Sequence, residues 1–150
     1  MRIKKYAVFL IWGFCIMGFT PVPPQNGQAT AKQDFQVKAQ HLINKTFEHY
    51  QHFSRAYFSG IISKDFTPND IDFISSVENG FNKGKILEMN YFIDEVIPEG
   101  NKLSISFKWQ KKVQYNNAKG VSLIEGNAQF VFSKEHGKWH LSQVDGDSPF

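Results

Sequence analysis

The most specific chemistry that this sequence could support is general acid–base catalysis. It requires a carboxylate or an imidazole held within hydrogen-bond reach of a reacting group, often with a hydroxyl beside it. Tyr57 and Tyr91 could supply the hydroxyl, and Asp94, Glu125 and His140 could supply the base. The hypothesis is a dyad of one tyrosine with one base, with Tyr91, Asp94 and His140 as the first catalytic candidates. The alternative is that these tyrosines pack with their hydroxyls at the rim of a core.

A metal site is the second possibility, because His41, Glu48 and His52 are separated by seven and four residues. On a helix this spacing places all three on one face. That face lies opposite the apolar positions of the same segment, which favours a solvated surface. We therefore predict no metal site.

No cofactor is indicated either. The chain has no glycine-rich phosphate loop, nucleotide fingerprint or thiol motif. Its one cysteine, Cys15, lies in an apolar run near the start, behind the bulky Phe14, which argues against lipidation. A mature chain without this run has no thiol for a disulfide or a nucleophile.

The charge balance argues against nucleic-acid binding. The formal net charge is +3, but three of the 17 basic residues lie among the first 31, where there is no acid. The remainder has 14 basic and 14 acidic side chains. A domain without net charge has no field that attracts phosphate backbones.

Residues 1–31 are predicted to be a signal peptide and a spacer. A basic start, Arg2 to Lys5, precedes an apolar run from Tyr6 to Phe19, as in secretory signals. The run is short for a membrane span, so we expect a periplasmic or secreted protein, with a retained N-terminal anchor as the alternative. Residues 21–28 are predicted to have no regular structure, and residues 32–150 to form a single domain.

Two segments have the apolar spacing of helices. From Lys32 to Phe58 apolar residues recur every three or four positions, which keeps one helix face apolar. A second helix is predicted from Pro68 to about Asn79, because Thr67 offers a capping hydroxyl and proline suits the first helical position.

Beyond these helices the apolar spacing changes to every second residue, which is typical of strands. Four antiparallel strands in a meander are predicted around the alternating stretches Leu87–Ile93, Leu103–Trp109, Val121–Phe132 and Trp139–Val144. The apolar parity switches near Gly126, which predicts a β-bulge that curves the sheet.

This order of elements predicts an α+β fold in which a cone-shaped, curved antiparallel sheet wraps around a long N-terminal helix. The mature chain resembles the nuclear transport factor 2-like superfamily, which includes SnoaL-like polyketide cyclases and ketosteroid-isomerase relatives. The resemblance covers about Lys32 to Phe150, and three stretches carry it: Gly126–Phe132, Gly137–Leu141 and Val144–Phe150.

The resemblance implies that the enzymes hold a carboxylate or histidine base inside the cone, facing a tyrosine or a second acid, and that the polar content of the cone separates them from the noncatalytic members. The positions expected to face inward on the first two strands include one phenol and no acid or histidine: Leu87, Met89, Tyr91, Ile93, Leu103, Ile105, Phe107 and Trp109. We therefore expect an exported noncatalytic binding or association module. The alternative is a small acid–base enzyme, such as an isomerase, dehydratase or cyclase, acting on an apolar small molecule.

A cavity in the cone is expected to be lined by Tyr50, Tyr57, Tyr91, Trp109 and Glu125. The expected partners are a small apolar ligand or an envelope protein. The outward-facing side chains of the sheet, among them Ser104, Ser106 and Lys108, are polar. By resemblance they predict a homodimer that pairs through this outer face.

Overall fold

The computed structural model describes residues 26–67 and 69–150. The predicted signal segment, up to residue 25, lies outside the described residues. The elements follow one another as α1 (Asn26–Gln51), α2 (Arg55–Ile61), β1 (Ile62–Thr67), α3 (Asp70–Asn82), β2 (Gly84–Glu99), β3 (Lys102–Tyr115), β4 (Ser122–Glu135) and β5 (Lys138–Gly146).

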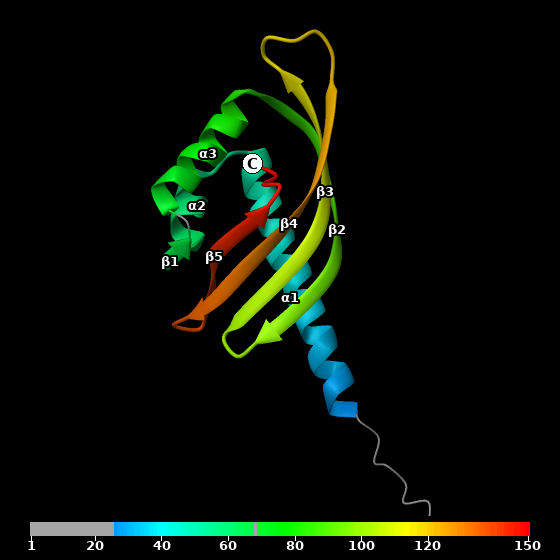
Figure 1. Ribbon diagram of the computed structural model, residues 1–150, viewed down its shortest axis with the longest axis vertical. Helices are drawn as coiled ribbons and strands as arrows, with labels where there is room; N and C mark the ends of the chain where they lie inside the picture. The colour runs from blue at the N-terminus through cyan, green and yellow to red at the C-terminus, as the bar shows by residue number, and fades with distance from the viewer. Residues whose placement is uncertain (1–25, 68) are drawn as a thin grey trace, which may run out of the picture.

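The strands form one curved sheet in the order β1-β5-β4-β3-β2 (Figure 1). The predicted α+β class is confirmed, and β2 to β5 form the predicted antiparallel meander. The sheet contains a further strand, because β1 pairs in parallel with β5, Ile62 opposite Leu141. The prediction missed β1 because its two buried side chains, Ser63 and Phe66, are three residues apart and show no alternation.

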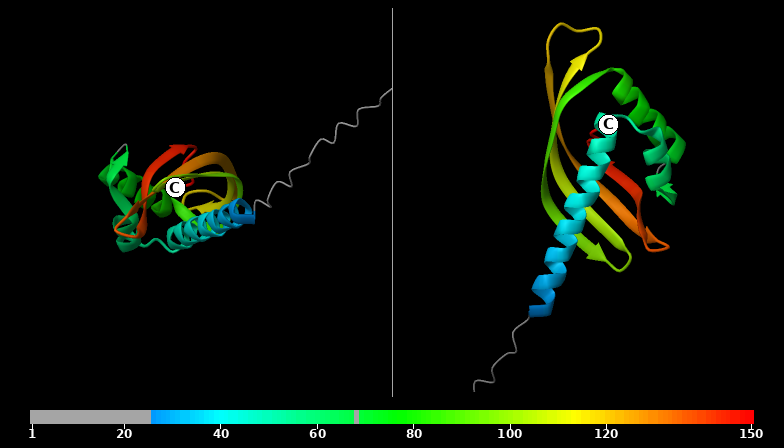
Figure 2. Two further views of the ribbon diagram at one scale, coloured as in Figure 1. Left: turned by 90° about the horizontal axis from the view of Figure 1, so that it is seen from below. Right: turned by 180° about the vertical axis from the view of Figure 1, so that it is seen from behind.

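The helices enclose the concave side of the sheet. α1 runs along the sheet, and α2 and α3 lie beside one end of it (Figure 2). One stripe of α1 packs on the sheet, with Ala39, Ile43 and Phe47 all buried. None of the described helices has the length and apolar character needed to span a membrane.

The first helical segment differs from its prediction at both ends. Helix α1 already begins at Asn26, so the last residues of the predicted unstructured spacer are helical. The alanines and glutamines that follow Asn26 favour helix and extend it. At the other end one helix is replaced by two, because Phe53 adopts a positive φ of 31° and the Ser54 side chain accepts a hydrogen bond from the Tyr57 N–H, capping α2.

Helix α3 begins later than predicted. Its capping residue is Asn69, whose side-chain oxygen accepts hydrogen bonds from the N–H groups of Ile71 and Asp72. Thr67, the predicted cap, is instead the last residue of β1. Pro68 lies outside the described residues.

The bulges that bend the sheet lie mainly in β2. The β3–β4 ladder continues without a shift through Gly126, so the bulge predicted there is wrong. Val121 and Leu123, which suggested a change of parity, are simply exposed, by 55% and 57%. In β2 the register shifts at Leu87 and again at Asp94, and the first shift turns Leu87 outward and Ile86 inward.

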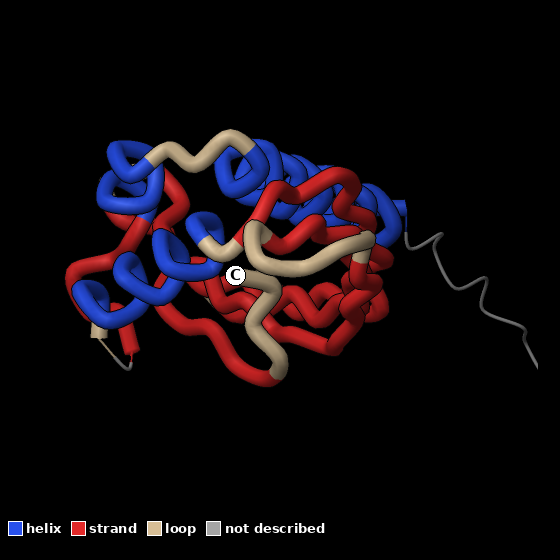
Figure 3. The backbone as a smooth tube through the Cα atoms, turned by 90° about the horizontal axis from the view of Figure 1, so that it is seen from above, coloured by secondary structure: helices blue, strands red, loops and turns tan. Residues whose placement is uncertain are grey.

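The residues after β5 return into the space between the helices and the sheet (Figure 3). Pro149 is fully buried. The ring of Phe150 packs against rings from four elements: Tyr50 of α1, Phe58 of α2, Phe73 of α3 and Phe130 of β4. This segment closes the core at the end of the sheet where α2 and α3 lie.

Candidate functional site

The interior of the cone is filled by aromatic side chains. Its largest side chains without solvent exposure are aromatic and come from both the helices and the sheet: Tyr50, Phe58, Phe107, Phe130 and Phe132. The rings of Phe107 and Phe130 meet edge to face, with their centroids 4.8 Å apart. Phe47 packs in the same way on Phe107, at 5.7 Å. Close packing of this kind leaves little room for a substrate.

Tyr91 faces α1, at the rim of this core. Its hydroxyl donates a hydrogen bond to Oδ1 of Asn44, 2.5 Å away, and accepts one from the side-chain amide of Gln40. Burial raises the pKa of Tyr91, and the hydrogen bond from Gln40 opposes this rise. Both partners are amides, which do not exchange protons as a catalytic base does.

The three candidate bases lie outside the cone. Asp94 is at the second bulge of β2, on the exposed side, with Oδ1 3.8 Å from Nζ of Lys108. Glu125 is exposed on β4, and His140 is half-buried on β5 opposite Ser133. Among the described residues, no hydrogen bond joins any of these bases to Tyr57 or Tyr91.

The remaining aromatic candidates for a cavity lining lie in different places. Tyr50 is fully buried, and burial is the main cause that raises its pKa to about 12. Trp109 is 5% exposed, and its Nε1 donates to the backbone oxygen of Asp147 over 2.7 Å. Tyr57 lies on the other side of α1, stacked on His49 with ring centroids 3.8 Å apart. The structure therefore does not gather these side chains around one cavity.

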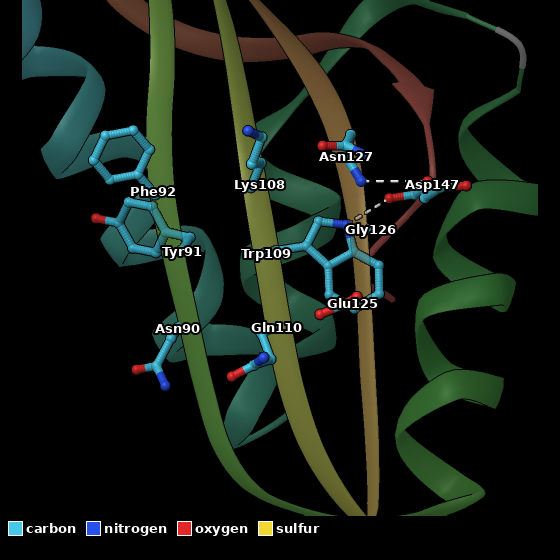
Figure 4. A pocket seen from close by; sticks show the side chains of 10 residues that line it. All are labelled: Asn90, Tyr91, Phe92, Lys108, Trp109, Gln110, Glu125, Gly126, Asn127 and Asp147. Carbon is cyan, nitrogen blue, oxygen red and sulfur yellow. Dashed lines mark hydrogen bonds between the residues drawn. The ribbon is translucent and has the colours of Figure 1, made fainter.

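A groove of about 590 Å³ runs across the outer face of the sheet (Figure 4). Tyr91, Trp109 and Gly126 are cross-strand neighbours, and their backbone forms its floor. Two rows of outward side chains form its walls, Phe92, Lys108 and Asn127 on one side and Asn90, Gln110 and Glu125 on the other. We call this feature the outer groove.

Asp147 closes one end of the outer groove. Its carboxylate accepts a hydrogen bond from the backbone N–H of Asn127, and its backbone oxygen accepts the one from Trp109 (Figure 4). A Cβ atom at Gly126 would lie 2.6 Å from that of Asp147 and 2.8 Å from the Trp109 ring. Only glycine fits this crossing without displacement.

Lys111 is the interior residue that the sequence interpretation missed. It is 8% exposed, and its Nζ donates to the backbone oxygen of Pro149 over 2.6 Å and lies 3.4 Å from the Tyr50 hydroxyl. The rings of Tyr50 and Trp109 also lie within 6 Å of Nζ, a cation–π distance. Burial, assisted by the charge of Lys83, lowers the pKa of Lys111 to about 8.

A small pocket of about 220 Å³ lies beside Lys111, between the end of α3 and the end of β3. Its lining includes Lys83, Tyr115 and Ser148 as well as the aromatic core. This volume is below the range of about 300–1,000 Å³ that is usual for small-molecule sites. Lys111 acts here as the internal donor that fixes the segment of Pro149 against α1.

The three candidate metal ligands are all exposed: His41 and Glu48 on α1, and His52 in the turn that follows it. In the described parts of the chain, no three or more histidine, cysteine, aspartate or glutamate side chains are grouped so that they could hold a metal ion.

Solved structures with the same arrangement of elements identify the fold. A conserved protein from Planctomyces limnophilus superposes with a TM-score of 0.62 at 17% identity, over 79% of this chain and 99% of its own. A nuclear transport factor 2-like superfamily protein from Salmonella enterica superposes with a TM-score of 0.61 at 12% identity, over 77% of this chain and 93% of its own. This chain has the nuclear transport factor 2-like fold.

A ketosteroid isomerase-like protein from Erwinia carotovora shares the nuclear transport factor 2-like fold, with a TM-score of 0.55 at 12% identity, over 69% of this chain and 88% of its own. The sequence matches no protein-family model and no curated protein. The nuclear transport factor 2-like fold is therefore established by geometry, and the activity has to be argued from the side chains.

Proposed function

We propose that this protein is an exported, noncatalytic association module of the nuclear transport factor 2-like fold, which forms a homodimer through the outer face of its sheet. The observation that carries the proposal is the position of the polar groups. The cone is packed with aromatic side chains, and the hollow surface of the sheet, the outer groove, lies on its outside. Export is inferred from residues 1–31.

The noncatalytic part of the proposal is supported by the contacts of Tyr91. An acid–base enzyme needs a titratable partner at this hydroxyl, as in the alternative with Asp94 or His140. The hydroxyl is instead occupied by Gln40 and Asn44. Asp94 lies near a lysine on the opposite face of the sheet.

The association part is supported by the mixed character of the outer face. Phe92 is 68% exposed on a wall of the outer groove, and Leu87 on the same strand is also exposed. Lys108 and Glu125 place charges of opposite sign on the two walls. In a two-fold dimer the same patch meets itself, so a patch with apolar groups and both charges is self-complementary.

Sedimentation velocity of the exported protein tests the dimer. We expect the wild-type protein to sediment as a dimer and Phe92→Asp to raise the dimer dissociation constant by about tenfold or more, since a buried apolar anchor is replaced by a charge. Ile71→Asp is the matched control, because Ile71 is 69% exposed and lies on α3. A wild-type monomer, or equal effects of both variants, would refute the proposed interface.

Intact mass of the same preparation tests export. We expect the protein recovered from the periplasm or the medium to lack the signal segment, with cleavage in the first 31 residues. Retention of residue 1 in a membrane fraction would support the anchored alternative in place of the signal peptide.

A further inference from the structure

A second hollow lies between α1, α2 and β5, and it shares no residue with the outer groove. Its volume is about 410 Å³. Its lining side chains come from α1, from α2 and from the first residues of β5. We call it the basic groove, and it is lined by Lys38, His41, Leu42, Lys45, Ala56, Tyr57, Gly60, Ile61, Lys138, Trp139 and His140.

The ionisable side chains of the basic groove, apart from the Tyr57 phenol, are all basic, although the domain as a whole has balanced charge. Lys38, His41 and Lys45 come from successive turns of α1, and Lys138 and His140 come from β5. No acid is among the lining residues. Within the described chain, the ion pairs involve other residues, so the three groove lysines remain available to a ligand.

One acid, Glu135, lies on β4 opposite Lys138, beside the basic groove. Glu135 accepts hydrogen bonds from the hydroxyls of Ser63 and Ser133, at 2.5 and 3.2 Å. The hydrogen bond from Ser63 is the main cause that lowers the pKa of Glu135, and the charge of His140 lowers it further. This carboxylate therefore stays ionised, and it lies opposite Lys138 in the β4–β5 ladder, so it offsets part of the positive charge on the β5 side of the groove. Lys38 and Lys45 of α1 supply the rest of the positive charge.

Two aromatic rings line the basic groove beside the charges. Lys45 Nζ lies 5.6 Å from the centroid of Tyr57, and Lys134 Nζ lies 6.0 Å from that of Trp139. The Tyr57 ring is held in place by stacking on His49 and by its hydroxyl, 3.4 Å from Oγ1 of Thr46. Rigid rings next to lysines offer a planar apolar surface and donors for an anionic group.

We propose that the basic groove binds a small organic anion that has a planar apolar body and a phosphate or carboxylate group. In this proposal Lys45 and Lys138 contact the anionic group, and the ring of Trp139 packs against the apolar body. The three lysines supply more positive charge than a neutral ligand could use, and the two histidine side chains add hydrogen-bonding groups. The rings are more apolar surface than an inorganic ion could use. The combination therefore selects a ligand with both parts.

Isothermal titration calorimetry of the exported protein tests this site with three probes: 1-naphthyl phosphate, which has both parts, inorganic phosphate and 1-naphthol. We expect 1-naphthyl phosphate to bind about tenfold or more tightly than either of the other two, and to weaken as salt is raised. Absence of measurable binding of 1-naphthyl phosphate at millimolar concentration overturns the proposal. Equal binding of inorganic phosphate also overturns it, because charge alone would then be responsible.

Matched variants test whether 1-naphthyl phosphate binds in the basic groove. The double variant Lys45→Ala with Lys138→Ala is expected to weaken 1-naphthyl phosphate about tenfold, since each exposed charge contact is worth a few-fold in affinity. The control, Lys102→Ala with Lys119→Ala, removes the same charge from exposed positions that do not line the basic groove. Equal loss in both variants would overturn the assignment to the basic groove.

Trp139→Leu should remove the preference for 1-naphthyl phosphate over inorganic phosphate, and retention of that preference would contradict the role of the ring.

The proposal for the basic groove and the proposal for the dimer can be refuted independently of each other. The variants of the basic groove should leave the sedimentation of the dimer unchanged, and Phe92→Asp should leave the binding of 1-naphthyl phosphate unchanged.

Discussion

Replacing Lys111 by methionine should make the protein more stable at neutral pH. The drop of the Lys111 pKa from 10.5 to about 8 corresponds to a cost of about 3 kcal/mol for keeping the buried ammonium charged, at about 1.4 kcal/mol per pKa unit. Methionine has a similar length without the charge. It loses the hydrogen bond to Pro149, worth about 1 kcal/mol, and the cation–π contacts. The net gain expected at pH 7 is about 1–2 kcal/mol.

The sign of the pH dependence follows from proton binding. Between pH 8 and 10.5 the unfolded chain holds a proton on Lys111 that the folded protein has released, so raising the pH stabilises the fold through this group. The penalty is fully present about one pH unit below the folded-state pKa of about 8 and declines as the pH rises through that value. Relative to Lys111→Met, the wild-type protein should therefore gain about 2 kcal/mol between pH 7 and pH 9.5.

Urea unfolding of both proteins at several pH values measures the difference. Lys112→Met is the control, because Lys112 is the next residue on the exposed face, paired with Glu88, and its ammonium is already in water. Its effect should not change through this window. A difference between Lys111→Met and the wild type that is constant from pH 7 to pH 9.5 would refute the claim that burial controls this lysine.

Two further changes test the local structure by urea unfolding. Asn69→Ala removes the acceptor for the first N–H groups of α3 and should cost about 1 kcal/mol, whereas Asn79→Ala, exposed within the same helix, should cost nothing; equal effects would contradict the cap. Ile86→Ala should cost about 2 kcal/mol and Leu87→Ala less than about 0.5 kcal/mol, because the bulge turns Ile86 inward; the reverse order would mean that β2 has no bulge there.

The fold class could be predicted because it follows from the spacing of the apolar residues and from the order of the helices and strands along the chain. The apolar residues of α1, spaced by three and four, form a buried helix face, and the alternating apolar residues from Leu103 to Trp109 form a buried strand face. The predictions that failed concern features set by single residues and their tertiary contacts. The positive φ of Phe53 divides the first helix, and nothing in its residue type requires that conformation. It is stabilised by the capping Ser54 and by the stack of Phe53 on Phe81.

The candidate site was harder to predict. The alternation of side chains tells which of them face inward only where the register of the strand is known. Lys111 continues the inward series of Trp109, so extending the alternation by two residues would have found it. The bulges of β2 change the parity at Leu87 and Asp94, where apolar and polar residues are adjacent and no glycine marks the shift. The basic groove joins residues of α1 and β5 that are about a hundred positions apart, and only the fold brings them together.

Because β2 is a terminal strand of the described sheet, its two bulges also bear on how the molecule can associate. A long regular edge offers a row of free backbone groups to any other extended chain. Here the register is interrupted at Leu87 and Asp94, charged side chains follow at Glu88 and Glu95, and Pro98 has no N–H to donate. The β2 edge is thus a poor template for strand addition and aggregation.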